Sequence, residues 1–417
     1  MTGPLQRDTL IVGGGIAGLR CAQDLARLGL ESAIVEKAPF FGGHVAHFCC
    51  KATDRCQRCG ACLLEDMLDE VAASDRISRL LRTTVSQIER RNGHFRAGLV
   101  RNPLRVLPEK CNDCNACLDT CPSPGALYRS PLGGRIMLDE EKCAFFLDGT
   151  CTACADVCTQ DAIDLKKGPE HLELEASSVI LACGFEAFDP REKPRFGYGR
   201  VAGVITGLEL ETRLREDNFI IPDHGGAPAA IAFIQCVGSR DPRIGRNYCS
   251  RVCCGYALRL ARLLKSRSSS VELSMFYMDI QSFDRDFERR LDEARREVRL
   301  IRAIPSEIRS GEDGRPELIY QGPEETRVRE SFDIVVLSVG ISPGASQRAI
   351  AELLGIKPNR EGFVGKDGDE VCVDTSGVFV AGTFQGPRSI EETVSHACRA
   401  AGETAAYLAR SRKGGKV

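Results

Sequence analysis

The sequence contains 417 residues, enough for two or three domains with full hydrophobic cores. Its 56 basic and 58 acidic residues are mixed along the chain, and the net charge of -2 gives no support for nucleic acid or an anionic membrane as the main partner. No apolar run approaches the roughly 18 residues that cross a bilayer, and residues 1–8 lack the apolar core of a signal peptide, so we expect a cytoplasmic protein.

The first element along the chain is a dinucleotide fingerprint. An apolar strand at residues 10–12 runs into a glycine-rich turn, and a helical pattern follows over residues 19–28. The first glycine permits a tight turn, the second lets the backbone approach a pyrophosphate at the helix N-terminus, and the third lets helix and strand pack closely. The next strand, residues 32–35, ends on Glu36, a carboxylate placed to bind ribose hydroxyls. This context favours a dinucleotide site over a structural glycine turn. The three glycines are Gly13, Gly15 and Gly18.

Further positions are expected to line the same cofactor site. Residues 40–44 (Phe-Phe-Gly-Gly-His) form a glycine turn that would lie beside the cofactor, and residues 177–184 are predicted to form a buried returning strand. Residues 377–383 are a strand ending in glycine before a long helix over residues 390–408. In two-domain flavoproteins the positive N-terminal end of such a helix stabilises the anionic reduced flavin. The predicted contacts beyond the fingerprint are Lys37, Gly42, Gly43, Gly184, Gly382, Thr383 and Gln385.

The chain has 21 cysteines, far above ordinary usage. Because cytoplasmic thiols stay reduced, clustered cysteines indicate metal or redox chemistry rather than disulfides. A first group of cysteines precedes a short helix predicted at residues 63–71. The cysteines at positions 56, 59 and 62 are each separated by two residues, so their thiolates can converge on one inorganic core, with the cysteine at position 49 or 50 as a fourth ligand. The alternatives are loop cysteines near a flavin, or a zinc site completed by His44 or His47. The group consists of Cys49, Cys50, Cys56, Cys59 and Cys62.

Residues 109–165 are predicted to form a separate module. The run Cys111-x2-Cys114-x2-Cys117-x3-Cys121-Pro122 is the bacterial ferredoxin signature, in which the fourth cysteine ligates the other cluster. A second run, Cys143-x7-Cys151-x2-Cys154-x3-Cys158, follows. Its seven-residue gap is longer than the usual two, and Thr159 stands where proline often follows, which affects the local geometry of the second site. We predict two cubanes rather than zinc or disulfides. One is held by Cys111, Cys114, Cys117 and Cys158, and the other by Cys121, Cys143, Cys151 and Cys154.

The strand at residues 229–237 begins a second domain whose first turn departs from a nucleotide site. A pyridine-nucleotide domain would carry glycines there, but this turn carries cysteines before a helix at residues 255–264, so binding of NAD(P)H is disfavoured. Four thiolates suffice for one more cubane. A Cys253/Cys254 redox pair and simple core cysteines are the alternatives, although adjacent cysteines strain to form a disulfide. The four residues are Cys236, Cys249, Cys253 and Cys254.

Five motifs in the second half of the chain resemble those of the heterodisulfide reductase HdrA family and its bacterial relatives. The resemblance covers nearly the whole chain. It implies a thioredoxin-reductase-like fold that binds FAD, with a cubane at the four cysteines from 236 to 254 and an inserted two-cluster ferredoxin module. It also implies a place in a complex that moves electrons through flavin, in some members by bifurcation. Long members add an N-terminal region and C-terminal ferredoxin modules, whereas we expect this chain to end with the flavin domain. Cys49, Cys50 and Cys56 exceed the family pattern, in which Cys59 and Cys62 are the recognisable pair. The motifs are residues 235–241 (QCVGSRD), 248–254 (YCSRVCC), 276–280 (FYMDI), 379–383 (FVAGT) and 385–387 (QGP).

We therefore expect an α/β, two-domain flavoprotein of the thioredoxin reductase type, with a Rossmann-type FAD domain, a degenerate NAD-like domain carrying a cluster, and the inserted ferredoxin module. The expected boundaries are 1–100, 170–226 and 345–417 for the FAD domain, 101–169 for the module and 227–344 for the degenerate domain.

The expected function is electron transfer by an FAD and 4Fe-4S subunit of a heterodisulfide-reductase-like complex, with three clusters and a fourth as an option at residues 49–62. Its partners would be other subunits and an electron donor or acceptor protein, with no nucleic acid and no membrane span, although a membrane-bound partner and a homodimer within the complex are both compatible. Two rivals are a stand-alone FAD-dependent pyridine-nucleotide disulfide oxidoreductase and a scaffold whose clusters only hold the fold.

Overall fold

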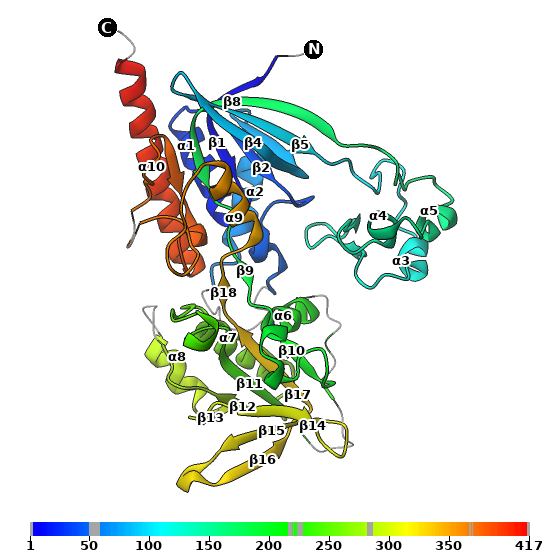
Figure 1. Ribbon diagram of the computed structural model, residues 1–417. Helices are drawn as coiled ribbons and strands as arrows, with labels where there is room; N and C mark the ends of the chain where they lie inside the picture. Colours follow the sequence, from blue (N-terminus) through cyan, green and yellow to red (C-terminus); the bar gives the residue numbers. More distant parts are fainter. Residues whose placement is uncertain are drawn as a thin grey trace.

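The computed structural model describes residues 3–49, 59–215, 219, 221–222, 228–281, 287–366, 368 and 370–414. Figure 1 shows these residues as a first lobe that contains both chain ends, a second lobe beneath it, and a small lobe of short helices to the right of the first. In the described part of the chain, no helix combines the length and apolar character needed to cross a membrane.

The first lobe is built on a seven-stranded sheet with the order β3-β2-β1-β8-β5-β4, to which β19 adds alongside β8. β1, β2, β3 and β19 join it in parallel, whereas β4 and β5 are antiparallel. Leu10 and Ile11 of β1 are fully buried because helices or loops cover both faces of the parallel part. The strands are β1 (Leu5–Val12), β2 (Ser32–Glu36), β3 (Ile77–Leu81), β4 (Thr83–Arg91), β5 (His94–Arg101), β8 (Glu170–Leu181) and β19 (Val378–Val380).

Two helices cover one face of this sheet. α1 (Ile16–Arg27) follows the fingerprint turn, and α10 (Ile390–Gly414) packs beside it, as Figure 1 shows. Leu19 of α1 and Ala401 of α10 belong to one hydrophobic core. α10 begins at Ile390, as the sequence predicts, and extends six residues beyond the predicted end at Leu408. The lobe is completed by α2 (Leu63–Ala73), η1 (Gly43–His47), α9 (Ala345–Leu353) and η6 (Gly382–Phe384).

The second lobe contains a five-stranded parallel sheet with the order β10-β17-β11-β12-β13. Helix α7 packs on it because Ala257, Leu260, Ala261 and Leu264 recur at helical spacing and are fully buried. The strands are β10 (Val204–Thr206), β11 (Ala230–Val237), β12 (Glu272–Phe276), β13 (Val298–Ile301) and β17 (Ile334–Val339). The helices are α6 (Gly207–Arg215), α7 (Cys253–Arg267) and α8 (Phe287–Ala294).

Two features of the second lobe differ from the sequence expectations. β10 and α6 fall within the expected second part of the FAD domain, residues 170–226, yet β10 pairs with β17 and α6 packs in the second-lobe core. An antiparallel sheet of β14 (Glu307–Ser310), β15 (Pro316–Gln321) and β16 (Arg327–Ser331) was not anticipated. The position of β10 depends on pairing with a strand that is distant in the sequence, and the β14–β16 sheet is built from strands with a weak alternating pattern. Local periodicity of apolar residues reveals neither feature.

The chain crosses between the lobes at two neighbouring strands. β9 (Glu186–Ala187) and β18 (Ile341–Ser342) pair antiparallel, with Ile341 opposite Ala187. Figure 1 shows these strands as the narrow connection between the upper and lower lobes.

The small lobe, here called the cysteine module, comprises residues 102–169 between β5 and β8. It has a core of its own that includes Ile136, Leu138 and several cysteines. On the hairpin that joins its two strands, the Pro131 carbonyl accepts a hydrogen bond from Arg215 of α6, which also donates to the Ala46 carbonyl of η1. One guanidinium therefore touches both lobes and the module. The module elements are α3 (Ala116–Thr120), β6 (Leu127–Arg129), β7 (Ile136–Leu138), α4 (Ala144–Asp148) and α5 (Ala153–Val157).

Candidate functional site

A cavity of about 770 Å³ is lined by residues of both lobes. On the first-lobe side it begins at the fingerprint turn between β1 and α1. The backbone N–H of Gly14 donates to Glu36 Oε2 over 2.7 Å, and the N–H of Ala38 donates to Oε1 over 2.8 Å. These bonds fix the Glu36 carboxylate at the end of β2, at the edge of the cavity.

The three fingerprint glycines meet different surroundings. A Cβ on Gly13, whose φ is +109°, would lie 2.4 Å from the Ala182 carbonyl oxygen, so no side chain fits there. A Cβ on Gly18 would lie 1.9 Å from the Gly13 oxygen, which shows how closely helix and turn pack. Gly15 faces the cavity, and no atom of the described residues lies within 4 Å of its Cβ position. The cradle is thus open only at the position where backbone would approach a phosphate.

Eight of the predicted cofactor contacts line the cavity, and three do not. Gly18 packs inside the lobe, and Gly382 packs against Ala17 and Thr393. Gln385 donates hydrogen bonds to the carbonyls of Lys366 and Glu370, so its side chain orders a loop instead of reaching the cavity. The eight that line it are Gly13, Gly15, Glu36, Lys37, Gly42, Gly43, Gly184 and Thr383.

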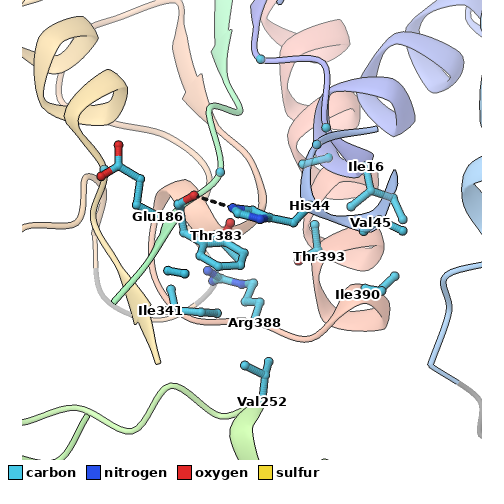
Figure 2. Close-up of a pocket in the computed structure, with 18 of the residues that line it drawn as sticks. Ile16, His44, Val45, Glu186, Val252, Ile341, Thr383, Arg388, Ile390 and Thr393 are labelled. Atoms are coloured by element: carbon cyan, nitrogen blue, oxygen red, sulfur yellow. Dashed lines mark hydrogen bonds between the residues drawn. The ribbon is translucent and has the colours of Figure 1, made fainter. Parts of the chain in front are cut away.

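His44 and Phe185 form an aromatic wall that the sequence analysis did not assign. Their rings stack with centroids 4.3 Å apart, and His44 Nε2 is 2.9 Å from the Phe185 carbonyl oxygen, the contact drawn as a dashed line in Figure 2. Burial lowers the pKa of His44, so the ring is neutral near pH 7. Cys183 also lines the cavity, where burial raises the pKa of its thiol to about 12. The glycine turn at residues 40–44 was the only sequence signal for this wall.

The first turn of α10 faces the same cavity. Ser389, Ile390 and Thr393 line it, and Figure 2 shows Ile390 and Thr393 on this helix, below Ile16 and Val45 in the view.

The start of α10 carries a capping box. The N–H of Glu392 donates to Ser389 Oγ over 3.2 Å, and the Ser389 N–H donates to Glu392 Oε2 over 2.9 Å. This reciprocal pair is the usual signature of a helix start.

The second lobe closes the cavity with the turn between β11 and α7. Arg251, Val252, Gly255 and Tyr256 line it, and Val252 lies below the pocket in Figure 2. The backbone of this turn is strained, because Cys236, Arg240 and Arg251 have φ values of 58°, 54° and 63°. Non-glycine residues in this region are uncommon and concentrate at functional sites.

The four cysteines of the turn lie close to one another. Burial raises the pKa of Cys253, and the neighbouring Cys236, Cys254 and Cys249 raise it further. Burial likewise raises the pKa of Cys236 to about 11. Charge on one thiolate would therefore be opposed by its neighbours unless a cationic core joined them.

A buried amide precedes Cys236 in the sequence. Gln235 is 1% exposed, and within the described residues neither its Oε1 nor its Nε2 has a hydrogen-bond partner. A buried amide left unpaired is costly, and cluster sulfurs accept hydrogen bonds, so this position fits an iron-sulfur core beside Cys236.

The structure also brings seven of the eight cysteines of the module near others of their predicted sets. Cys111, Cys114, Cys117 and Cys158 line one small cavity with the apolar Val106, Ile136 and Ile163, which is the set predicted for the first cubane. For the second set, burial raises the pKa of Cys154 to about 11, with further effects of Cys143 and Cys121. Cys151 lies two residues before α5.

The early cysteines are placed only in part. Cys50 and Cys56 lie outside the described residues. Cys49 is buried, and its backbone N–H donates to Glu211 Oε1 over 2.6 Å. Cys59 lines the large cavity, and Cys62 is exposed at the N-cap of α2.

No three described Cys, His, Asp or Glu side chains are grouped to hold a single metal ion. A cubane spreads its four thiolates over a wider shell than one ion does.

Known proteins identify the architecture. Residues 8–49 match the model of the FAD binding domain family. The A component of the H(2):CoB-CoM heterodisulfide,ferredoxin reductase of Methanothermobacter marburgensis is 32% identical over 424 residues, covering 95% of this chain and 63% of that protein. The iron-sulfur A component of the CoB--CoM heterodisulfide reductase of Methanocaldococcus jannaschii is 32% identical, covering 98% of this chain and 65% of that protein. The chain is similar to these two proteins over almost all of its own length. It spans no more than about two thirds of the length of these two relatives.

The fold comparison agrees with the sequence comparison. Thioredoxin reductase from Lactococcus lactis superposes with a TM-score of 0.55 at 14% identity, covering 97% of this chain and 99% of that chain. Thioredoxin reductase from T. acidophilum gives the same TM-score at 15% identity with the same coverage. The predicted thioredoxin-reductase-like fold is therefore confirmed.

Proposed function

We propose that this chain is an FAD and iron-sulfur electron-transfer subunit of a heterodisulfide-reductase-like complex, an oxidoreductase that exchanges electrons between its flavin and clusters and its partner subunits. Three 4Fe-4S clusters are proposed, two in the cysteine module and one at the β11–α7 turn, with residues 49–62 as the location of a fourth. The names of its relatives, which include the A component of the ferredoxin:CoB-CoM heterodisulfide reductase of Methanosarcina mazei, support this function.

The observation that carries the proposal is the composition of the large cavity. The dinucleotide turn at Gly13 and Gly15 forms one wall, and the cysteine-bearing turn at Arg251 and Val252 forms another. A flavin bound in this cavity would therefore lie beside the turn that carries the four thiols, which supports the proposal. In a pyridine-nucleotide reductase the second turn would hold a nucleotide phosphate instead.

The residues on the first-lobe side would hold FAD. Glu36, fixed by two backbone N–H groups, is placed to accept hydrogen bonds from ribose hydroxyls, and the open Gly15 position admits a pyrophosphate. His44, neutral and stacked on Phe185, would exclude water from one side of the cavity. Bound FAD supplies the coupling of a two-electron carrier to one-electron carriers.

Partners and compartment follow from the same chemistry. Because thiols stay reduced in the cytoplasm, the many free cysteines support a cytoplasmic location. Electrons would enter and leave through other subunits of the complex and through an electron donor or acceptor protein.

The test is the cofactor content of anaerobically purified protein. About one FAD and about 12 irons per chain are expected for three cubanes, and about 16 if residues 49–62 hold a fourth. Cys253→Ser should lose about four irons and Cys111→Ser a different four, whereas Cys398→Ser, on α10, should lose none. Eight irons or fewer in protein shown to retain its clusters would contradict the site at Cys253. Rapid flavin bleaching by NAD(P)H without partners would instead support the stand-alone disulfide reductase.

A further inference from the structure

An ion pair joins the cysteine turn of the second lobe to the first turn of α10. Arg251 Nη2 donates to Glu392 Oε1 across 141 positions of sequence, and the two side chains are 37% and 33% exposed. Arg251 lines the large cavity itself, as do Ser389, Ile390 and Thr393 around Glu392. The pair therefore lies at the boundary between the proposed flavin site and the proposed cluster.

Each partner is also tied to the site on its own side. The backbone N–H of Arg251 donates to Cys249 Sγ over 3.3 Å, and Arg251 adopts the left-handed conformation, with φ 63°. Glu392 Oε2 accepts the N–H of Ser389, leaving Oε1 for Arg251. A chain of contacts thus runs from a proposed cluster ligand, through Arg251 and Glu392, to the helix end that faces the flavin site.

The electrostatic role of the pair follows from its position. The N-terminus of α10 carries a partial positive charge that would favour an anionic reduced flavin, and the Glu392 carboxylate in the first turn opposes that charge. Arg251 neutralises Glu392 from the other lobe. Glu391, the other acidic residue of the first turn, also lines the cavity, so seating of the cysteine turn removes only the part of the opposing charge that Glu392 carries.

We propose that Arg251 is a positioning residue that holds the cysteine turn against α10 and, by neutralising Glu392, raises the affinity of the site for reduced FAD. This inference rests on the proposed function, because it assumes that FAD occupies the cavity. It predicts that the two charges act in opposite directions on the flavin, which a purely structural contact would not do.

The experiment compares Arg251→Gln, Glu392→Gln, the double variant and Arg251→Lys in the full-length protein. Glutamine at position 392 keeps the capping box, because Ser-x-x-Gln caps as Ser-x-x-Glu does, so only the charge is removed. The measurements are the dissociation constants for oxidised and reduced FAD, and the midpoint potential of bound FAD. The matched control is Arg299→Gln, which breaks the Arg299–Glu330 ion pair of the second lobe, outside the cavity lining.

We expect Arg251→Gln to lower the affinity for reduced relative to oxidised FAD by roughly two- to five-fold, the effect of one charge at a helix end. The midpoint potential should fall with it. Glu392→Gln should shift both quantities the other way, the double variant should lie near the wild type, and Arg251→Lys should restore most of the wild-type value. The control should change neither quantity. Shifts of the same sign in both single variants, or no shift in Arg251→Gln, would overturn the proposal.

The iron content of the same proteins separates the two proposals. If wild-type protein lacks the irons expected at Cys253, the proposed cluster fails, while the FAD measurements still decide the role of Arg251. If the wild type holds about 12 irons and the FAD measurements do not move, the ion-pair proposal alone fails.

Discussion

Replacing Gly15 and Gly18 by alanine should separate folding of the fingerprint from binding of its cofactor. In Gly18→Ala the new Cβ would lie 1.9 Å from the Gly13 oxygen, so the backbone must move. Such overpacking costs about 1–3 kcal/mol, partly offset by about 1 kcal/mol from the better helix propensity of alanine. We expect a net loss of up to about 2 kcal/mol in the stability of the apo-protein.

Gly15→Ala should leave the fold almost unchanged. The Gly15 φ of -74° suits any residue, and no atom of the described residues lies within 4 Å of the new Cβ. The expected cost is a small loss of stability, because alanine is a poorer N-cap than glycine. The methyl group would instead stand in the space that a pyrophosphate needs. Loss of one hydrogen bond to a charged group costs about 1.5–3 kcal/mol, or roughly 10- to 150-fold in the FAD dissociation constant.

Both quantities can be measured on the same preparations. Thermal unfolding of the apo-protein by circular dichroism reports stability, and titration with FAD, followed by flavin fluorescence, reports affinity. The reasoning is refuted if Gly15→Ala binds FAD like the wild type, or if it lowers the unfolding midpoint as much as Gly18→Ala.

Two buried ion pairs give further predictions. Arg259→Met should destabilise the second lobe by about 3–5 kcal/mol, because it leaves the buried Glu211 carboxylate without its cation. Adding Glu211→Leu should recover most of this loss of stability. Chemical unfolding of the two apo-protein variants measures the recovery, and its absence would contradict the prediction. The hydrogen bond from Lys193, whose Nζ is 2.7 Å from Asp241 Oδ2, lowers the pKa of Asp241 to about 2. Because this pKa lies below the unfolded value of about 3.9, the pair stabilises the fold above about pH 4 and loses that effect as the pH falls toward 2. The difference in unfolding midpoint between wild-type and Asp241→Asn apo-protein should therefore shrink over that range, and a constant difference would contradict the assignment.

Local signals accounted for the parts of the site that are built from neighbouring residues. The strand, turn and helix around Gly13 and Gly15 are specified by apolar residues and glycines within a dozen positions, and the α10 start at Ile390 follows a capping sequence. Glu36 could be placed because one helix separates it from the fingerprint by a predictable length. These features depend on short-range geometry that the sequence shows directly.

Other features depend on contacts between distant segments. The exposed and half-buried residues of β16 (Arg327–Ser331) give no clear strand pattern without its partner β15. The Arg251–Glu392 pair joins two lobes, and no sequence motif around either residue predicts that the two side chains meet. Gln385 appeared to be a cofactor contact because it follows the glycine strand, but its side chain is used by two carbonyls of a neighbouring loop.

The way in which the cysteine module joins the first lobe bears on its origin. Arg101, the last residue of β5, lies directly opposite Glu170, the first residue of β8. All residues between them leave and return at one end of an antiparallel pair, where an ordinary hairpin turn would suffice. The ancestral sheet could therefore have acquired the module in a single genetic event without altering any strand register. The same junction offers protein engineers a location at which the cysteine module could be exchanged for another domain.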